Sequence, residues 1–331
     1  MFTQENSRNH KYKKIFWSVL LLVNLAALGM LLLAGYTKKD YSANQKEHSY
    51  LIGISYMTMN NEFYKIVSEE ISARVEAEGD RLILRDPALD ADRQKQQIDD
   101  MLDMGVDVLI IAPVEWESLS SVLERAKEKG VLIVAVDTDI YDEHLVDCTI
   151  TSDNYHAGAV VGEYFLKQCE EAKLVIMTHE TAKSGQDRVR GFLDTVEKQK
   201  SIEIVKEIEC KGQLEIAMPQ LQKVIDEGVE FDNVFCLNDL SSVGVVASLE
   251  ENHMIDTVGV YGVDASPDSK ALIKEGMMQA SAAQFPSEIG KIAADMVYKL
   301  LNGESVEKKI LVPVKLITQE NVEEFGIDRW Q

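Results

Sequence analysis

The stretch YLIGISYMTMNNEFY, residues 50–64, joins a short apolar run to a polar, aromatic segment. The run Tyr50–Tyr56 has the length of a strand, and an amphipathic stretch of helical length follows it. The pattern recurs at Val106–Ala112 and Val131–Val136. Continuous β-branched runs separated by helices indicate parallel strands that are buried on both faces. The sequence therefore predicts an α/β fold of doubly wound, Rossmann-like units.

Ten such runs fall into two series along the chain, which predicts two similar lobes rather than one sheet. The first series is Tyr50–Tyr56, Arg81–Arg85, Val106–Ala112, Val131–Val136 and Thr149–Ser152. The second series is Lys173–Thr178, Ile202–Glu209, Asn233–Leu237, Thr257–Val263 and Met277–Ala283. In such sheets ligands bind beyond the carboxyl ends of the strands, so the residues after each strand are candidates for a site.

The run Ile15–Tyr36 carries no charged side chain. As a helix it would reach about 33 Å, enough to cross a bilayer. The basic stub 1–14 before it favours a cytoplasmic N-terminus and places the remaining chain outside the cell membrane. We expect an uncleaved single-pass anchor followed by a polar tether, residues 37–48. A cleaved export signal is the alternative, and the sequence leaves it open.

The whole chain of 331 residues has a formal net charge of −22. A surface this acidic repels phosphate backbones, so a nucleic-acid partner is not expected. Hydrophobic residues make up 46% of the chain, which excludes a mainly disordered or fibrous protein.

The predicted strands end in carboxylates, carboxamides and aromatic side chains, as at Asp137, Asn238 and Asp264. Carboxylates and amides hydrogen-bond neighbouring hydroxyl groups, and aromatic rings cover the C–H face of a sugar. Each polar residue has an alternative role as a helix cap or turn residue. Their recurrence at nearly every strand end favours a binding site.

Catalytic and cofactor motifs are absent from the sequence. It contains no glycine-rich phosphate loop, no histidines at metal-site spacing and no nucleophile elbow. We therefore expect no cofactor, no metal site and no enzymatic activity. Four cysteines, Cys148, Cys169, Cys210 and Cys236, permit disulfides outside the cell, but the sequence assigns no bridge.

From about Tyr50 to Leu316 the chain resembles the ribose-binding group of periplasmic sugar-binding proteins. The motifs that carry the resemblance are Asn60–Tyr64, Ala135–Asp137, Thr151–Asn154, Arg188–Phe192, Val234–Asp239, Gly262–Asp264 and Gln284–Pro286. The resemblance implies that three hinge strands join an N-terminal lobe, 49–152 plus 285–313, to a C-terminal lobe, 153–284 plus 314–331. It also implies that the lobes close on a monosaccharide.

By position, the resemblance assigns nine residues to ligand binding. They are Asn61, Phe63, Tyr64, Asp137, Thr138, Gln186, Asn238, Asp264 and Gln284. Thr138 and Gln186 stand where ribose binders carry arginine, and we take Arg188 as structural. The expected pocket is therefore acidic and lacks a cation. This argues against ribose itself and against sugar phosphates or sugar acids, and favours a neutral or cationic hydroxyl-rich ligand.

These features predict a membrane-anchored extracytoplasmic receptor for a monosaccharide or a related polyol. Its partner would be an ABC-type permease or a sensor histidine kinase, and the sequence does not decide between transport and sensing. A receptor for a non-sugar signal molecule and an enzyme are the alternatives.

Overall fold

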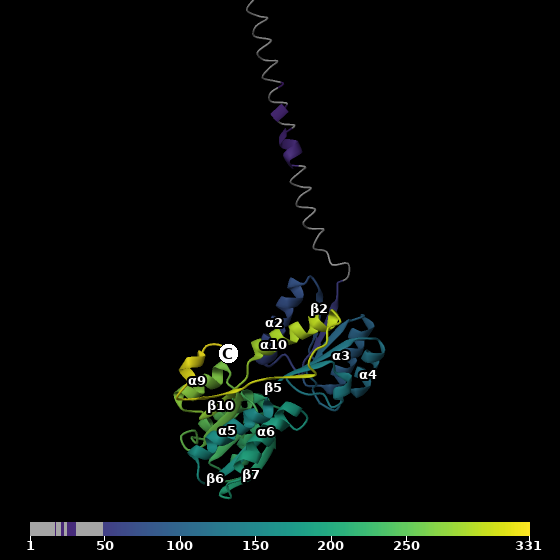
Figure 1. Ribbon diagram of the computed structural model, residues 1–331. Coiled ribbons are helices and arrows are strands. Elements are labelled where there is room, and N and C mark those ends of the chain that lie inside the picture. The colour runs from purple at the N-terminus through teal and green to yellow at the C-terminus, as the bar shows by residue number, and fades with distance from the viewer. Residues whose placement is uncertain (1–16, 18–20, 23–24, 31–48) are drawn as a thin grey trace, which may run out of the picture. The chain divides into compact units, whose positions relative to one another are not determined.

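The computed structural model describes Trp17 and residues 21–22, 25–30 and 49–331 (Figure 1). The chain divides into two compact units, Met1–Ser49 and Tyr50–Gln331. In the first unit, Trp17 and residues 21–22 and 25–30 are helical and exposed. Among the described residues, no helix is both long and apolar enough to span a bilayer. The predicted anchor Ile15–Tyr36 falls mainly outside them, and the predicted stub and tether fall wholly outside them.

The unit Tyr50–Gln331 contains two six-stranded sheets. The strand order of the first sheet is β11-β5-β4-β3-β1-β2, and all its pairings are parallel. Its strands are β1 (Leu51–Ser55), β2 (Arg81–Arg85), β3 (Val108–Ile111), β4 (Leu132–Val136), β5 (Cys148–Ser152) and β11 (Lys309–Val312). We call this sheet and the helices packed on it the first lobe.

The second sheet has the order β12-β10-β9-β8-β6-β7, and its pairings are parallel except for the antiparallel β10–β12 pair. Its strands are β6 (Ala172–Thr178), β7 (Ile202–Glu209), β8 (Asn233–Cys236), β9 (Gly259–Asp264), β10 (Ala280–Ala283) and β12 (Lys315–Thr318). We call this sheet and its helices the second lobe. The predicted two-lobe α/β fold is confirmed.

Helices alternate with the strands and cover the sheets. They are α2 (Glu62–Ala77), α3 (Ala91–Asp103), α4 (Ser120–Glu128), α5 (Asn154–Gln168), α6 (Lys183–Val196), α7 (Leu214–Asp226), α8 (Asp239–Glu251), α9 (Pro267–Glu275) and α10 (Pro286–Leu301). The unit Tyr50–Gln331 also contains two short 3-10 helices, Glu143–Leu145 and Val322–Phe325. Central strands such as β1 and β3 are buried along their whole length, which explains their continuous apolar sequence.

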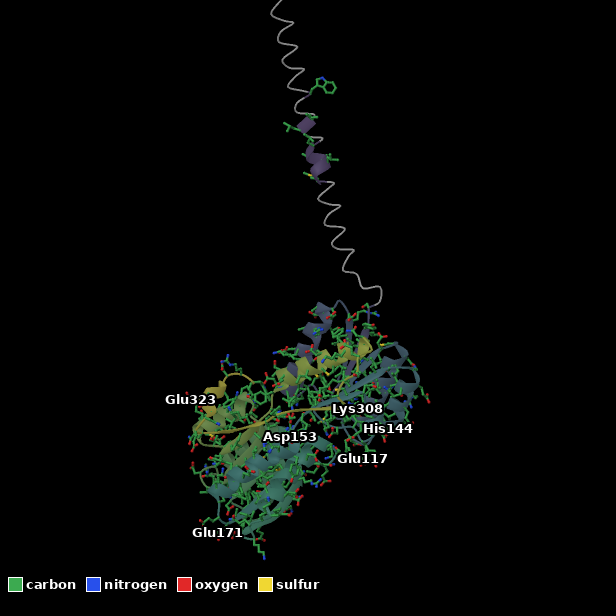
Figure 2. The ribbon with its side chains drawn as sticks, viewed as in Figure 1. Glu117, His144, Asp153, Glu171, Lys308 and Glu323 are labelled. Atoms are coloured by element: carbon green, nitrogen blue, oxygen red, sulfur yellow. The ribbon has the colours of Figure 1, made fainter. Side chains whose placement is uncertain are left out.

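The chain passes between the lobes three times, from β5 to α5, from β10 to α10 and from β11 to β12. Figure 2 shows Asp153 at the first passage, between the lobes, where its backbone N–H donates to the carbonyl of Val312 (3.0 Å). The strands β11 and β12 were not among the runs predicted from sequence. They are four residues long, mostly exposed or half-buried, and separated by Pro313, so they lack a buried apolar pattern.

Candidate functional site

A cavity lies between the two lobes, at the carboxyl ends of strands from both sheets. The space open to the centres of water molecules is about 40 Å³. The cavity is lined by seven of the nine residues expected from sequence: Asn61, Phe63, Tyr64, Asp137, Asn238, Asp264 and Gln284. The tertiary structure thus brings together side chains that are more than 220 positions apart in the sequence.

Direct contacts hold the two lobes together around this cavity. The Trp116 N–H of the first lobe donates to the carbonyl of Thr181 in the second (3.0 Å). The Ser184 N–H donates to Thr138 Oγ1 (3.0 Å), and Asn60 Nδ2 donates to Glu215 Oε1 (3.1 Å). Because backbone and side-chain bonds cross between the lobes, the structure describes a closed form.

Arg188 is the central charge of the site. Its side chain extends from α6 and is 5% exposed. Nη2 lies 3.8 Å from Asp137 Oδ1 of the first lobe, and Nη1 lies 3.4 Å from Asp264 Oδ1 of the second. Nε donates to Asn154 Oδ1 (2.8 Å), and Nη1 also donates to the carbonyl of Leu237 (3.2 Å). One guanidinium therefore connects carboxylates of both lobes.

The prediction of a pocket without a cation is wrong, because Arg188 lines the cavity. Close packing of α5 against α6 positions this residue. A Cβ atom built at Gly158 would lie 1.8 Å from the carbonyl oxygen of Arg188, so only glycine allows this approach. This packing allows the buried guanidinium to reach the carboxylates of Asp137 and Asp264. Sequence position alone suggested a structural side chain, and the structure places it between the two acidic residues.

Asp137 follows β4 and has a φ angle of 70°, which is unusual for a residue other than glycine. Its Oδ2 accepts a hydrogen bond from the Tyr64 hydroxyl (2.7 Å). Burial raises the pKa of the Asp137 carboxyl, while Arg188 and the Tyr64 hydroxyl act in the opposite direction. The strained backbone aims an ionisable group into the cavity and keeps it beside a cation.

Asp264 ends β9 and has a φ angle of 128°. Burial raises the pKa of its carboxyl to about 6, and Arg188 opposes that rise. Behind it lies Asp239, whose pKa burial and the Asp264 charge raise to about 7. Asp239 is held by the Ser266 N–H (2.8 Å) and by the Ser281 hydroxyl (2.8 Å). A buried carboxylate pair thus supports this wall of the cavity.

Gln284 follows β10, at the second passage between the lobes, and is 1% exposed. Its Nε2 donates to Asp264 Oδ1 (2.6 Å), but its Oε1 is buried and finds no hydrogen-bond partner among the residues that the structure describes. A buried amide oxygen without a partner costs about 1–3 kcal/mol. A ligand hydroxyl that donates to Oε1 would recover that cost.

Three predicted residues lie at the start of α2. Asn61 is its N-cap and accepts the N–H of Phe63 through its side chain (2.9 Å), so the cap role holds. The Phe63 and Tyr64 rings meet edge to face, with centroids 5.5 Å apart. Both rings are nearly fully buried and line the cavity. They form its apolar wall.

Asn238 combines the two roles that the sequence left open. It caps α8, because its Oδ1 accepts from the Ser241 N–H (3.1 Å). Its Nδ2 donates to the carbonyl of Gly212 (3.0 Å). Asn238 nevertheless lines the cavity and keeps one amide hydrogen for another acceptor.

Thr138 and Gln186 do not line the cavity, in contrast to their predicted role. Thr138 is fully buried, and its hydroxyl accepts from the other lobe as described above. Gln186 donates to the carbonyl of Glu180 and faces a separate surface groove. Gln186 lines that groove together with Val189 and Arg190, whereas Arg188 of the same helix lines the cavity.

Eleven residues that line the cavity were absent from the predicted set, among them His179, Lys211 and Gln213. His179 follows β6, and burial together with the Lys211 and Arg188 charges lowers its pKa to about 4. Lys211 and Gln213 follow β7. The strand-end rule already pointed to His179, directly after the predicted strand Lys173–Thr178, although His179 was not assigned to the site. Applied to the predicted strand Ile202–Glu209, the same rule would also have pointed to Lys211. Within the described part of the chain, no cluster of side chains suits a metal ion.

The four cysteines are free thiols. Cys148, Cys210 and Cys236 are buried, and burial raises the pKa of each thiol. They act as small apolar residues of the two cores.

Comparisons with known proteins all identify similarity to binding proteins over most of the chain. A family model described as "Periplasmic binding protein domain" matches residues 52–305. The ribose import binding protein RbsB of Bacillus subtilis is 26% identical over 287 residues, which cover 86% of this chain and 92% of that protein. A putative rhizopine-binding protein of Rhizobium meliloti is 27% identical over 290 residues, 84% of this chain and 93% of that protein.

A solved structure with the same fold is an ABC transporter solute binding protein from Bacillus halodurans with bound myo-inositol. Its TM-score is 0.79 at 23% sequence identity, and the match covers 85% of this chain and 98% of the other.

Proposed function

The chain belongs to the family of periplasmic binding protein domains, and from this premise we propose that it is a receptor for a monosaccharide or related polyol. The family consists of binding proteins, so the prediction that the chain is not an enzyme is confirmed. The observation that carries the proposal is the buried Arg188 between Asp137 and Asp264, beside the unpaired Gln284 Oε1.

The charges of the cavity wall favour a neutral ligand. Asp137 and Asp264 are offset by Arg188 and Lys211, and the low pKa keeps the His179 ring neutral at pH 7. A sugar or polyol hydroxyl both donates and accepts, so a row of hydroxyls can pair with carboxylate, guanidinium and amide groups at once. Hydrogen bonds to charged groups contribute about 1.5–3 kcal/mol each.

The lobe contacts support a hinge mechanism. Most residues that line the cavity are buried, so a monosaccharide reaches it only after the lobes separate. A ligand that contacts Asp137 on one lobe and Asp264 on the other stabilises the closed form, because only closure brings both carboxylates to it.

The proposed biological role is that of a solute receptor for an ABC-type uptake system. The similarity to a ribose import binding protein and to a solute binding protein of an ABC transporter supports it. A fixed anchor also suits a receptor that presents its closed lobes to a sensor histidine kinase. The family similarity favours transport.

Calorimetric titration of the full chain with D-ribose, D-allose, L-arabinose and myo-inositol tests the proposed ligand class. We expect at least one of them to bind with micromolar affinity, about −8 kcal/mol. D-Ribose 5-phosphate should not bind, because the balanced charges of the wall offer no net attraction to a dianion. Titrations with amino acids test the alternative that the ligand is not a sugar. The proposal fails if amino acids bind and no sugar or polyol does.

We further propose that the chain is anchored in the cell membrane by the uncharged run Ile15–Tyr36, with the two lobes outside. The expected result is a native protein with the intact mass of the full chain, found in the membrane fraction. Intact-mass spectrometry after cell fractionation provides the measurement. A mature N-terminus beyond Tyr36 would show that the segment is a cleaved export signal instead.

A further inference from the structure

The segment Phe325–Gln331 contacts both lobes beside the cavity, and Figure 1 shows its end between α9 and α10. Phe325 and Ile327 pack against the apolar core of the second lobe. Trp330 packs against the core of the first lobe. The segment therefore connects the lobes in addition to the three chain passages.

Lys270 on α9 holds this segment to the second lobe. It is fully buried, and burial lowers the pKa of its ammonium group. Its Nζ donates to the carbonyl oxygens of Phe325 (3.4 Å), Gly326 (2.7 Å) and Arg329, and to Gln331 Oε1 (3.1 Å). All four acceptors belong to the segment. The buried ammonium group of Lys270 therefore depends on the segment for its hydrogen bonds.

The last two residues reach the groups that form the site. Gln331 Nε2 donates to the carbonyls of Asp264 (2.9 Å) and Gln284 (2.7 Å). The Trp330 ring meets Phe63 edge to face, with centroids 6.1 Å apart, and its Nε1–H donates to Glu62 Oε2 (3.2 Å). Three cavity-lining residues, Phe63, Asp264 and Gln284, are thus fixed from behind by two neighbouring side chains.

We propose that Trp330 and Gln331 are positioning residues of the binding site, and that the segment Phe325–Gln331 stabilises the closed lobes. The contacts of Trp330 with Phe63 and Glu62 join the second lobe to the first, so lobe separation breaks them. The contacts of Gln331 and Lys270 lie within the second lobe and keep the segment in place when the lobes separate. The inference rests on the proposed function only for its effect on ligand affinity.

Hydrogen–deuterium exchange of the unliganded full chain tests this without a ligand. The Trp116 amide reports closure, because it donates across the lobes to the carbonyl of Thr181, and neither residue belongs to the segment. Trp330→Ala should speed its exchange roughly tenfold, because an aromatic pair and a hydrogen bond are lost. Trp330→Phe, which retains the ring contact, should restore most of the protection.

Lys270→Met provides an independent variant, since it releases the segment without touching the first lobe, and it should reproduce the effect of Trp330→Ala. Arg329→Ala is the matched control. Its side chain is exposed, and the carbonyl that Lys270 contacts is retained, so Trp116 should exchange as in the wild type.

A merely structural role makes a different prediction, namely faster exchange throughout the second lobe, including β8 and its neighbours. That outcome, or an unchanged Trp116 amide in Trp330→Ala, would overturn the proposal. A second readout is the dissociation rate of myo-inositol or D-ribose, which Gln331→Ala should raise several-fold. If neither compound binds the wild type, the proposed ligand class fails, while the exchange result still decides the role of the segment.

Discussion

Replacing Arg188 with alanine is expected to abolish ligand binding and to lower the free energy of unfolding by about 3–5 kcal/mol. The guanidinium is 5% exposed and lies between Asp137 and Asp264. Its removal leaves two buried carboxylates without the cation that contacts both of them, and it also leaves Asn154 Oδ1 without its donor. Urea denaturation and calorimetric titration measure the two effects.

Arg188→Lys separates binding from folding. Lysine keeps the positive charge but lacks the planar fork that reaches four partners, so affinity should fall more than tenfold with a smaller loss of stability. Arg190→Ala is the matched control on the same helix. Arg190 is 71% exposed and pairs with Asp194 at 3.6 Å on the surface, so its loss should change stability by less than about 0.5 kcal/mol. Unchanged sugar affinity in Arg188→Lys would show that the guanidinium is structural only.

Asp264→Ala is expected to lower sugar affinity at least a hundredfold. The carboxylate is 4% exposed, lines the cavity and accepts from Gln284, so its removal leaves both the ligand hydroxyls and the Gln284 amide unpaired. Asp268→Ala is the control, because Asp268 lies in the first turn of α9 and is exposed. Its affinity should equal that of the wild type. Lower thermal stability with unchanged affinity in Asp264→Ala would contradict a binding role.

The same carboxyl predicts how affinity depends on pH. Burial raises the pKa of Asp264 to about 6 in the unliganded site. A hydroxyl that donates to this group requires the ionised form, so protonation competes with the ligand. The dissociation constant should therefore be constant above pH 7 and rise as the pH falls through 6. Titrations between pH 5 and 8 measure this dependence. The dissociation constant of the Asp264→Asn variant should be nearly independent of pH across that range.

The local sequence determined the elements that carry the site. A buried strand such as β3 consists of apolar residues along its whole length, which is sufficient to identify a parallel strand. Strand ends in an α/β sheet meet at one edge, so Asp137, Asn238 and Asp264 could be selected from their positions alone. Short, half-exposed strands such as β11 and β12 carry no such pattern and were missed.

Only the tertiary structure decided which charges meet. Arg188 lies 49 residues or more from Asp137, Leu237 and Asp264 in the sequence, and close helix packing at Gly158 brings it between them. Likewise, Trp330 and Lys270 act on the site through contacts with residues up to 268 positions away. Hydrophobic periodicity reports whether a residue is buried, but the direction of a side chain and its partners depend on how the lobes pack. The sequence therefore determined where a site could form, whereas the packing of the two lobes determined its charge balance.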